Sequence, residues 1–374
     1  MLSYIEISQK NLVHNFRMMK SLLRPGVKIV SVIKADAYGH GQNVVAKILE
    51  KETDYFQVDD FQELKELRKV SKKPTFVFGY VGKSEMAEAI KLGGILCAYD
   101  EKQIKNINAA AKKLGKKAIV HIKIDAALGR QGVLVKNLQK LINVLKKCQN
   151  IIVDGTYSHF ANIEDTTDFS HAQKQLNLFD QAYQIFLKNG YTKIKTHISA
   201  SSGIMAYENK KGKSSLARTG ISLYGLWPSE DLRKKLETKK FRLKPVLRWI
   251  THVAQIKNLP KNHPIGYGLT YVTKRPMKVA VTPQGYSDGF DRGLSNSGGV
   301  LIQGKRCKIL GRVAMNMFVV DVSHLKNIKN EEEVVLLGRQ RKAEITAEEI
   351  AERLGTINYE VVARISPLLP RIIR

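Results

Sequence analysis

Six cationic or titratable side chains stand at the ends of short apolar runs, or just after them. The six are Lys34, Lys123, Arg130, His159, His197 and Arg218. Ser199, Ser201, Ser202 and Gly220 follow the last two runs, and hydroxyl and backbone N–H groups of this kind bind phosphate. If the runs are parallel strands of one barrel, their carboxyl ends meet and the six side chains share one site. Singly, each has an ordinary explanation as a surface lysine or core histidine; together they predict a site for an anionic ligand.

Among phosphate-bearing ligands, pyridoxal phosphate is the one whose chemistry calls for a lysine. A desolvated amine beside other cations has a lowered pKa and forms a Schiff base with an aldehyde. A nucleotide is the weaker alternative. Gly212-Lys213-Ser214 resembles the end of a P-loop, but Tyr207 stands where its first glycine belongs, and no G-x-G-x-x-G sequence occurs. We expect no metal site, since neither H-E-x-x-H nor a C-x-x-C pair is present.

The elements that must position these side chains alternate between strand and helix patterns from residue 28 to residue 220. The predicted strands are Ile29–Ile33, Tyr55–Val58, Thr75–Phe78, Ile95–Ala98, Ala118–Ile124, Ile151–Tyr157, Lys193–Ile198 and Leu216–Arg218. Segments with apolar residues at helical spacing lie between them, as at 44–49, 61–67 and 138–145. Eight such units over about 190 residues predict an α/β fold of the (β/α)₈ barrel type. A doubly wound open sheet is the alternative.

The pattern changes after Pro228. Strand-like segments at 243–258, 277–283, 299–303, 306–313 and 317–322 are separated by turn residues. One helix is predicted near the end, at 346–354, opened by a capping arrangement between Thr346 and Glu349. We therefore expect a barrel domain over residues 1–238 and a mostly β domain over 239–374.

The chain is strongly basic, with 62 Lys and Arg against 34 Asp and Glu among 374 residues and a net charge of +28. This charge is dispersed over short polar stretches, whereas a nucleic-acid-binding protein concentrates it in a stripe or tail, so we expect no nucleic-acid partner. The three cysteines are widely separated, which is typical of a reducing compartment. No signal peptide and no run of 18 apolar residues is present, so we expect a cytoplasmic protein without a membrane partner.

Several motifs, in order along the whole chain, resemble those of alanine racemases. They are Val32–Gly41 (VIKADAYGHG), Lys123–Asp125 with Gly129–Gly132, Ser158–Phe160, His197–Gly203, Arg218–Gly225, Gly266–Gly268, Gly285–Gly289 and Asn358–Glu360. The resemblance implies a pyridoxal phosphate barrel followed by a β domain. It also implies a homodimer with shared active sites, in which the β domain gives the second catalytic base to the partner chain. The expected reaction is the interconversion of L- and D-alanine, which supplies D-alanine for peptidoglycan.

The resemblance assigns a role to single residues. Lys34 corresponds to the lysine that bonds the cofactor and acts as base on one face of the substrate, and Tyr267 to the base on the opposite face. Arg218 corresponds to the arginine facing the pyridine nitrogen; because a guanidinium does not give up a proton there, the ring stays a weak electron sink. The other cofactor-binding positions are Tyr38, His159, His197, Ser201, Gly220, Ile221 and Tyr359. The substrate-binding positions are Arg130 and Met315, supported by Lys123, which is often carbamylated in the family, Tyr286 and Asn316.

Three positions depart from the family pattern. Asn316 stands where an aspartate is common, Ala200 replaces a common asparagine, and Ala126-Ala127-Leu128 replaces a Thr-Gly-Met run. These departures concern substrate choice. Two alternative functions therefore remain within the same fold: a racemase of serine or of several amino acids, and a related barrel-type decarboxylase. A basic nucleic-acid-binding or scaffold protein is the alternative from another class.

Overall fold

The computed structural model describes residues 1–208 and 214–374, so Gly212 and Lys213 of the P-loop-like sequence lie outside the described residues. The chain forms two units. The barrel unit comprises residues 12–35 and 45–244, and the sheet unit comprises residues 1–11, 36–44 and 245–374. Two helices, α1 (Gln9–Ser21) and α3 (Gln42–Leu49), continue along the chain from the sheet unit into the barrel unit.

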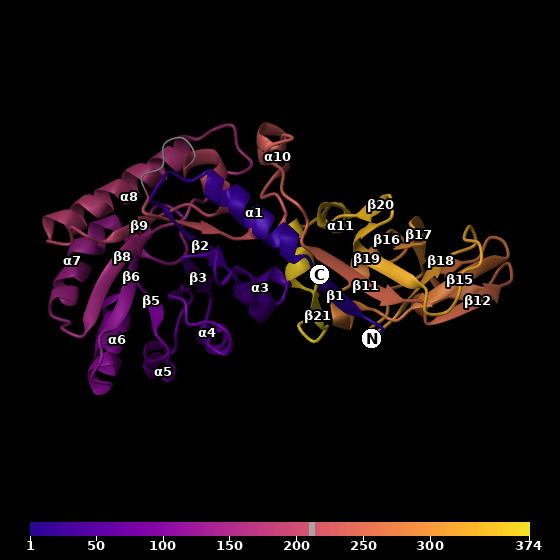
Figure 1. The fold of residues 1–374 in the computed structure, drawn as a ribbon, viewed down its shortest axis with the longest axis horizontal. Helices are drawn as coiled ribbons and strands as arrows, with labels where there is room; N and C mark the ends of the chain where they lie inside the picture. Colours follow the sequence, from indigo (N-terminus) through magenta and orange to yellow (C-terminus); the bar gives the residue numbers. More distant parts are fainter. Residues whose placement is uncertain (209–213) are drawn as a thin grey trace. The chain divides into compact units, whose positions relative to one another are not determined.

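The barrel unit is built on eight parallel strands among the described residues (Figure 1). Their order is β10-β2-β3-β4-β5-β6-β8-β9, with bounds β2 (Lys28–Val32), β3 (Tyr55–Val58), β4 (Thr75–Val77), β5 (Gly94–Ala98), β6 (Ala118–Asp125), β8 (Ile151–Tyr157), β9 (Lys195–His197) and β10 (Leu216–Thr219). The short β7 (Val133–Leu134) pairs with the end of β6. Backbone bonds from Ser215 N to Thr196 O (2.9 Å) and from Arg218 N to Ser199 O (3.2 Å) join β10 to β9, so the barrel is nearly closed. The predicted barrel is confirmed.

Helices cover the outside of these strands (Figure 1). They are α4 (Phe61–Leu67), α5 (Met86–Lys91), α6 (Glu101–Lys113), α7 (Val135–Lys146) and α8 (Ser170–Lys188), with the short α9 (Ser201–Gly203) and α10 (Glu230–Leu236) after β9 and β10. Asp60 caps α4 by accepting the N–H of Glu63 at 2.9 Å, and Asp100 caps α6 by accepting that of Gln103 at 2.8 Å. These caps fix where each helix begins after its strand.

Aromatic and imidazole rings fill the interior of the barrel. Phe78 stacks on Tyr157 with ring centroids 4.2 Å apart, and Tyr157 stacks on His197 at 5.0 Å, nearly parallel. Phe76 packs against His121 and His197 at 4.7 and 5.6 Å. The interior of the barrel is therefore a packed core, and one of the rings in it, His197, is a predicted site residue.

The sheet unit is built on a long mixed sheet with the order β12-β15-β18-β17-β16-β19-β11-β1-β21. The bounds are β1 (Tyr4–Ile7), β11 (Leu247–His252), β12 (Gln255–Leu259), β15 (Met277–Thr282), β16 (Gly299–Ile302), β17 (Lys305–Leu310), β18 (Phe318–Asp321), β19 (Glu333–Gln340) and β21 (Arg371–Ile373). β20 (Ala343–Ile345) pairs with β19, and β13 (Pro264–Ile265) forms a hairpin with β14 (Tyr271–Val272). Two helices follow, α11 (Ala347–Leu354) and α12 (Asn358–Ala363).

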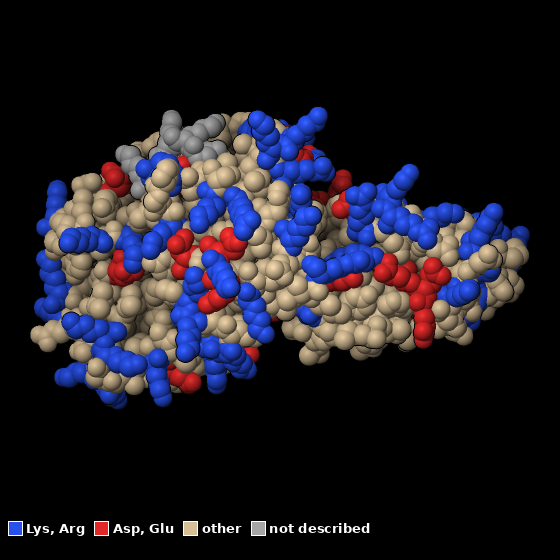
Figure 2. All heavy atoms as spheres, viewed as in Figure 1, with Lys and Arg blue, Asp and Glu red and all other residues tan. Residues whose placement is uncertain are grey.

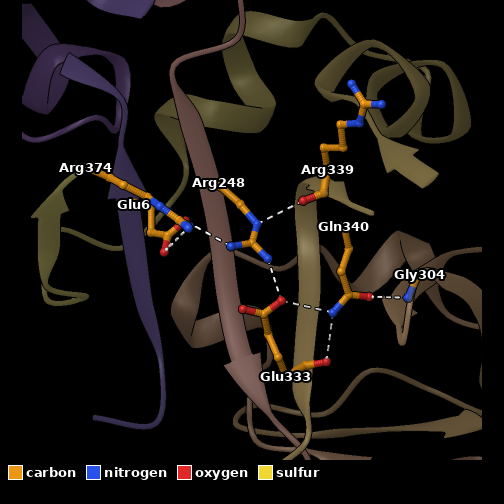
Figure 3. Close-up of polar contacts among 7 residues, drawn as sticks. All are labelled: Glu6, Arg248, Gly304, Glu333, Arg339, Gln340 and Arg374. Carbon is orange, nitrogen blue, oxygen red and sulfur yellow. Dashed lines mark hydrogen bonds and ion pairs between the residues drawn. The ribbon is translucent and has the colours of Figure 1, made fainter. Parts of the chain in front are cut away.

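One arginine ties three strands of this sheet together (Figure 3). The guanidinium of Arg248 donates to Glu6 Oε2 at 3.0 Å, to Glu333 Oε1 at 2.5 Å and to the carbonyl of Arg339 at 3.0 Å. Arg374 donates to the same Glu6 carboxylate at 3.0 and 2.9 Å. The two chain ends are thereby fastened to β11 and β19 within the sheet unit.

The division of the chain differs from the predicted boundary after residue 238. β1 pairs with β11 and β21, so the first residues belong to the sheet unit, and the units meet along the chain at Lys244 and Pro245. The predicted strand at 243–258 is two strands, β11 and β12. Six other strands of this unit were not predicted, namely β1, β13, β14, β19, β20 and β21, nor was α12. The predicted cap of the last long helix is present, since Thr346 Oγ1 accepts the N–H of Glu349 at 3.1 Å.

Lys and Arg side chains are spread over the face of the molecule shown in Figure 2, with Asp and Glu among them. They do not gather into a single stripe on that face. Within residues 1–208 and 214–374, no helix has the length and apolar character that a membrane crossing requires.

Candidate active site

Lys34 follows β2 after one intervening residue, Ile33, at the carboxyl end of the barrel strands. Its Nζ lies 3.2 Å from Asp59 Oδ1, a carboxylate that follows β3. The neighbouring Glu63, in the first turn of α4, accepts the backbone N–H groups of Ala35 at 2.6 Å and Asp59 at 2.7 Å. One carboxylate thus holds the backbone on both sides of this ion pair, and Lys34 is positioned by helix α4 as well as by its own strand.

The backbone then enters a left-handed turn, α2 (Lys34–Tyr38). Residues 35–38 all have φ between 51° and 54°, although none of them is glycine. Left-handed geometry costs about 1–2 kcal/mol for each such residue, so other contacts must stabilise it. Asp36 accepts the N–H of Gln42 at 2.8 Å and pairs with Arg371 at 3.2 Å. Gly39 is required after the turn, because a Cβ there would lie 1.9 Å from the carbonyl oxygen of Val362.

Lys123 and Arg130 approach the same end of the barrel from β6 and the loop after it. Lys123 is buried, and its Nζ donates to Gln131 Oε1 at 3.1 Å. Burial lowers the pKa of Lys123 to about 8, helped by the charges of Arg130, Arg218 and Lys34. Asp125 shapes the loop by accepting the N–H groups of Leu128 and Gly129 at 2.9 and 3.0 Å. Three other cations at this rim are therefore close enough to lower the pKa of Lys123.

Arg218, at the end of β10, is buried among these groups. Its Nη2 donates to the carbonyls of Ser158 at 2.7 Å and Ile198 at 2.8 Å, and lies 3.4 Å from His159 Nδ1. Burial, together with the charges of Arg218 and Arg130, lowers the pKa of His159 to about 3. His159 is therefore neutral at physiological pH, while Arg218 keeps its charge.

A second group of donors follows β9 and β10. Ser201 is buried, and its Oγ accepts the N–H of Gly220 at 2.9 Å and that of Ser222 at 3.4 Å. Gly220 precedes a 3₁₀ turn that starts at Ile221. The structure thus brings Ser201, Gly220 and Ile221 together, as the sequence predicts for a phosphate site.

The remaining predicted residues lie in the sheet unit. The rings of Tyr38 and Tyr359 lie 6.2 Å apart and are tilted by 55°. Tyr267 is 74% exposed and sits between Gly266 and Gly268, both of which have positive φ. A tight turn of the β13–β14 hairpin therefore presents the Tyr267 phenol outward.

Tyr286, Met315 and Asn316 are brought together by two adjacent loops of the sheet unit. The N–H of Tyr286 donates to Ala314 O at 3.1 Å, and that of Ser287 to Met315 O at 3.1 Å. Gly285 allows this close approach, because a Cβ there would lie 2.3 Å from two carbonyl oxygens. Asn316 Nδ2 donates to Ser287 Oγ at 2.9 Å, so a neutral hydrogen bond orients this side chain.

Comparison with known proteins agrees with this geometry. Residues 7–228 match the family model described as "Alanine racemase, N-terminal domain", and residues 246–373 match "Alanine racemase, C-terminal domain". The chain belongs to the alanine racemase family. Its relatives include alanine racemase 2 of Caldanaerobacter subterraneus subsp. tengcongensis, 38% identical over 98% of this chain and 94% of that protein. The alanine racemase of Syntrophobacter fumaroxidans is 36% identical over 97% of this chain and 95% of that protein.

Solved alanine racemases have the same fold. The enzyme of Clostridium difficile 630 superposes with a TM-score of 0.92 at 34% identity, covering 100% of this chain and 96% of that one. The enzyme of Bacillus anthracis with bound L-Ala-P gives 0.93 at 30% identity, covering 100% and 95%.

Sequence reasoning missed several residues that position the site of this alanine racemase family member. Asp59 and Glu63 hold Lys34 and the backbone beside it, Gln131 accepts from Lys123, and Arg371 supports the left-handed turn. Asp59 and Glu63 could have been predicted from the sequence, because they flank the capping residue of α4 directly after a predicted strand. Arg371 could not, since nothing in the local sequence links residue 371 to residue 36.

Proposed function

We propose that this protein interconverts L- and D-alanine, with pyridoxal phosphate as its cofactor. The observation that carries the proposal is the convergence of Lys34, Lys123, Arg130, His159 and Arg218 at one barrel rim, where the neighbouring charges help to lower the pKa of Lys123 and of His159. Such a concentration of positive charge is stable when an anion binds there.

The residues present fit this cofactor. Ser201 Oγ accepts the N–H groups of Gly220 and Ser222, which leaves its hydroxyl proton to donate to a phosphate beside the Ile221 turn, and Lys34 offers an amine at the end of a strand. Arg218 is held by the carbonyls of Ser158 and Ile198, so its guanidinium is fixed where a charged donor is needed. When bound, pyridoxal phosphate withdraws electrons from the substrate α-carbon and makes its proton removable.

Racemisation requires one group to remove that proton and another to return a proton from the opposite face. We assign Lys34 to one face and the Tyr267 phenol to the other. Arg218 remains charged throughout, because a guanidinium does not lose its proton in proteins. It therefore stabilises the site as a donor, without exchanging a proton of its own.

We propose that a second copy of the chain supplies Tyr267. The sheet unit exposes several large apolar side chains on the β13–β14 hairpin and on the two loops that carry Tyr286 and Met315: Tyr267, Leu269, Val272, Tyr286, Met315 and Met317. An apolar surface of this kind is typical of an interface, and a homodimer is the commonest way to cover one. Each dimer would then contain two shared sites.

For the substrate, we propose that Arg130 binds the carboxylate, with Met315 beside it and Tyr359 limiting the side chain to a small group. The product D-alanine would supply peptidoglycan synthesis. The cysteines of the described chain, Cys97, Cys148 and Cys307, are buried thiols, which fits the reducing cytoplasm in which we propose the enzyme acts. Asn316 favours a test of serine as a second substrate, because the usual carboxylate is replaced by a neutral amide.

The direct test is incubation of the purified protein with cofactor and L-alanine in deuterated water. We expect D-alanine that carries deuterium at the α-carbon, and no product from the Lys34→Ala variant. Serine and other amino acids form parallel arms that measure substrate range. Decarboxylation of any of them, or faster turnover of serine than of alanine, would replace the alanine assignment.

The shared site has its own test. A dimer of one Lys34→Ala chain and one Tyr267→Ala chain contains one intact site and one doubly altered site. With random mixing, about a quarter of the wild-type activity should return, since half of the dimers are mixed. If the mixture stays inactive while mixed dimers form, Tyr267 does not act across the interface.

A further inference from the structure

A chain of buried polar groups runs through the barrel from His197 to the side opposite the candidate site. His197 Nε2 lies 2.9 Å from His121 Nδ1, and His121 Nε2 lies 2.9 Å from Asp154 Oδ2. Lys195 Nζ donates to Asp154 Oδ1 at 2.6 Å and to Oδ2 at 2.8 Å. Both imidazoles are fully buried, while Asp154 and Lys195 are 25% and 33% exposed. None of the motifs in the sequence pointed to His121, Asp154 or Lys195.

Two backbone features hold this chain of groups in place. The pairing of β6 with β8 shifts between Val120 and His121, so Asp154 is an extra residue in β8. This bulge turns the Asp154 side chain toward His121. The next residue, Gly155, gives the His121 ring its room, because a Cβ there would lie 2.3 Å from the ring.

The direction of the hydrogen bonds follows from the carboxylate at the end. The charge of Asp154 is already balanced by Lys195. Although burial raises the pKa of Asp154, the hydrogen bonds from His121 and Lys195 and the charge of Lys195 hold it at about 2. An ionised carboxylate only accepts, so His121 Nε2 must donate to it. Burial lowers the pKa of His121, which leaves that ring neutral and its Nδ1 an acceptor. His197 Nε2 must therefore carry the proton shared with His121 Nδ1.

The other ring nitrogen of His197, Nδ1, then carries no proton and presents a lone pair. Burial and the charge of Arg218 lower the pKa of His197 well below its usual value, so this ring is neutral too. Among the described residues, His197 Nδ1 is buried without a hydrogen-bond partner. The guanidinium of Arg218 lies over the same two rings, Tyr157 and Phe78, on which His197 stacks. A lone pair beside this cation is favourable, whereas an N–H group would be repelled.

We propose that Asp154, acting through His121, holds His197 in the tautomer whose Nε2 carries the proton and whose Nδ1 presents a lone pair near Arg218. His121 and Asp154 are thus positioning residues for Arg218. The expected effect on catalysis rests on the proposed function, but the tautomer does not. The experiment can therefore refute the tautomer without refuting the proposed function, and the reverse.

The test is Asp154→Asn. An asparagine has one oxygen and one NH₂ group, and Lys195, which only donates, takes the oxygen. The NH₂ group then faces His121 Nε2 and forces it to accept. His121 Nδ1 becomes the donor, His197 Nε2 the acceptor, and the proton of His197 moves to Nδ1. One substitution of nearly equal size should thus reverse both histidines.

The readout is the solid-state ¹⁵N spectrum of cofactor-loaded protein labelled at its nine histidines, in which protonated and unprotonated ring nitrogens are distinct. Signals are assigned with His121→Gln and His197→Gln variants. In the wild-type protein we expect both rings to be protonated at Nε2, and in Asp154→Asn both at Nδ1. The matched control is Asp54→Asn, because the Asp54 carboxylate accepts the N–H of Ile29 at 2.9 Å in the same barrel. This control should leave both tautomers unchanged.

Kinetics form the second arm. We expect Asp154→Asn to lower kcat about 10-fold with KM changed less than about twofold, since the altered hydrogen bonds act through Arg218. Asp54→Asn should retain the wild-type kcat. A wild-type His197 protonated at Nδ1, or tautomers that do not change in Asp154→Asn, would overturn the proposal. If the Asp154→Asn variant fails to fold, the wild-type spectrum still tests the proposal, because it shows which ring nitrogen of His197 is protonated.

Discussion

Arg371 offers a quantitative test of how the left-handed turn is held. Its side chain is 5% exposed and donates to the carbonyls of Gly39 at 2.8 Å, Ser366 at 2.7 Å and Leu369 at 2.6 Å, in addition to its pair with Asp36. Arg371→Met leaves three carbonyls without this donor, at about 1 kcal/mol each, and the half-buried ion pair adds up to about 1 kcal/mol. We expect a total loss of about 3–4 kcal/mol.

Urea unfolding and thermal melting measure this loss. For a unit of this size, it corresponds to a melting temperature lower by about 10 °C. Arg374→Met is the matched control, because Arg374 is 69% exposed and pairs with Glu6 at the surface, where a pair is worth under about 1 kcal/mol. Equal losses in the two variants would show that the bonds of Arg371 do not stabilise the turn.

Three further predictions follow from charges inside the two units. The pKa of Lys123 is lowered to about 8, so the unfolded chain binds the extra proton and stability should rise from pH 8 toward 10; Lys123→Met should abolish this rise in urea midpoints. The pKa of His159 is lowered to about 3, so this residue alone should contribute a fall in stability of about 2 kcal/mol as pH drops from 7 to 5, and the fall measured for His159→Asn should be smaller than that of the wild-type protein by this amount. Arg248→Met should cost about 3 kcal/mol, because it leaves the carboxylates of Glu6 and Glu333 in the sheet without their shared partner; a melting temperature equal to wild type would contradict this.

The barrel could be predicted from the sequence because its strands are apolar runs separated by helices with one apolar face. The structure reproduces Tyr55–Val58 and Ile151–Tyr157 to the residue. Strand β1 could not be placed, because its partners β11 and β21 lie more than two hundred residues away and its own alternation is short. The apolar run of β19, in contrast, was readable and was missed.

The candidate site divides in the same way. Lys34, Lys123 and Arg218 were found because side chains at the ends of parallel strands converge by geometry alone. The partners that fix them come from elsewhere in the chain. Glu63 contacts the backbone beside Lys34 from a helix. The orientation of Asp154 depends on a β-bulge that no residue type in the local sequence predicts. Local patterns therefore predict which residues meet, and tertiary contacts decide how each one is oriented and charged.

The most direct measurement concerns Lys34 itself. The protein is loaded with pyridoxal phosphate, treated with borohydride to fix the cofactor to its lysine, digested and analysed by mass spectrometry. We expect the added mass on the peptide that contains Lys34, and none in the Lys34→Ala variant. Modification of a different lysine in the wild-type protein, or no bound cofactor after loading, would contradict the assignment of this site.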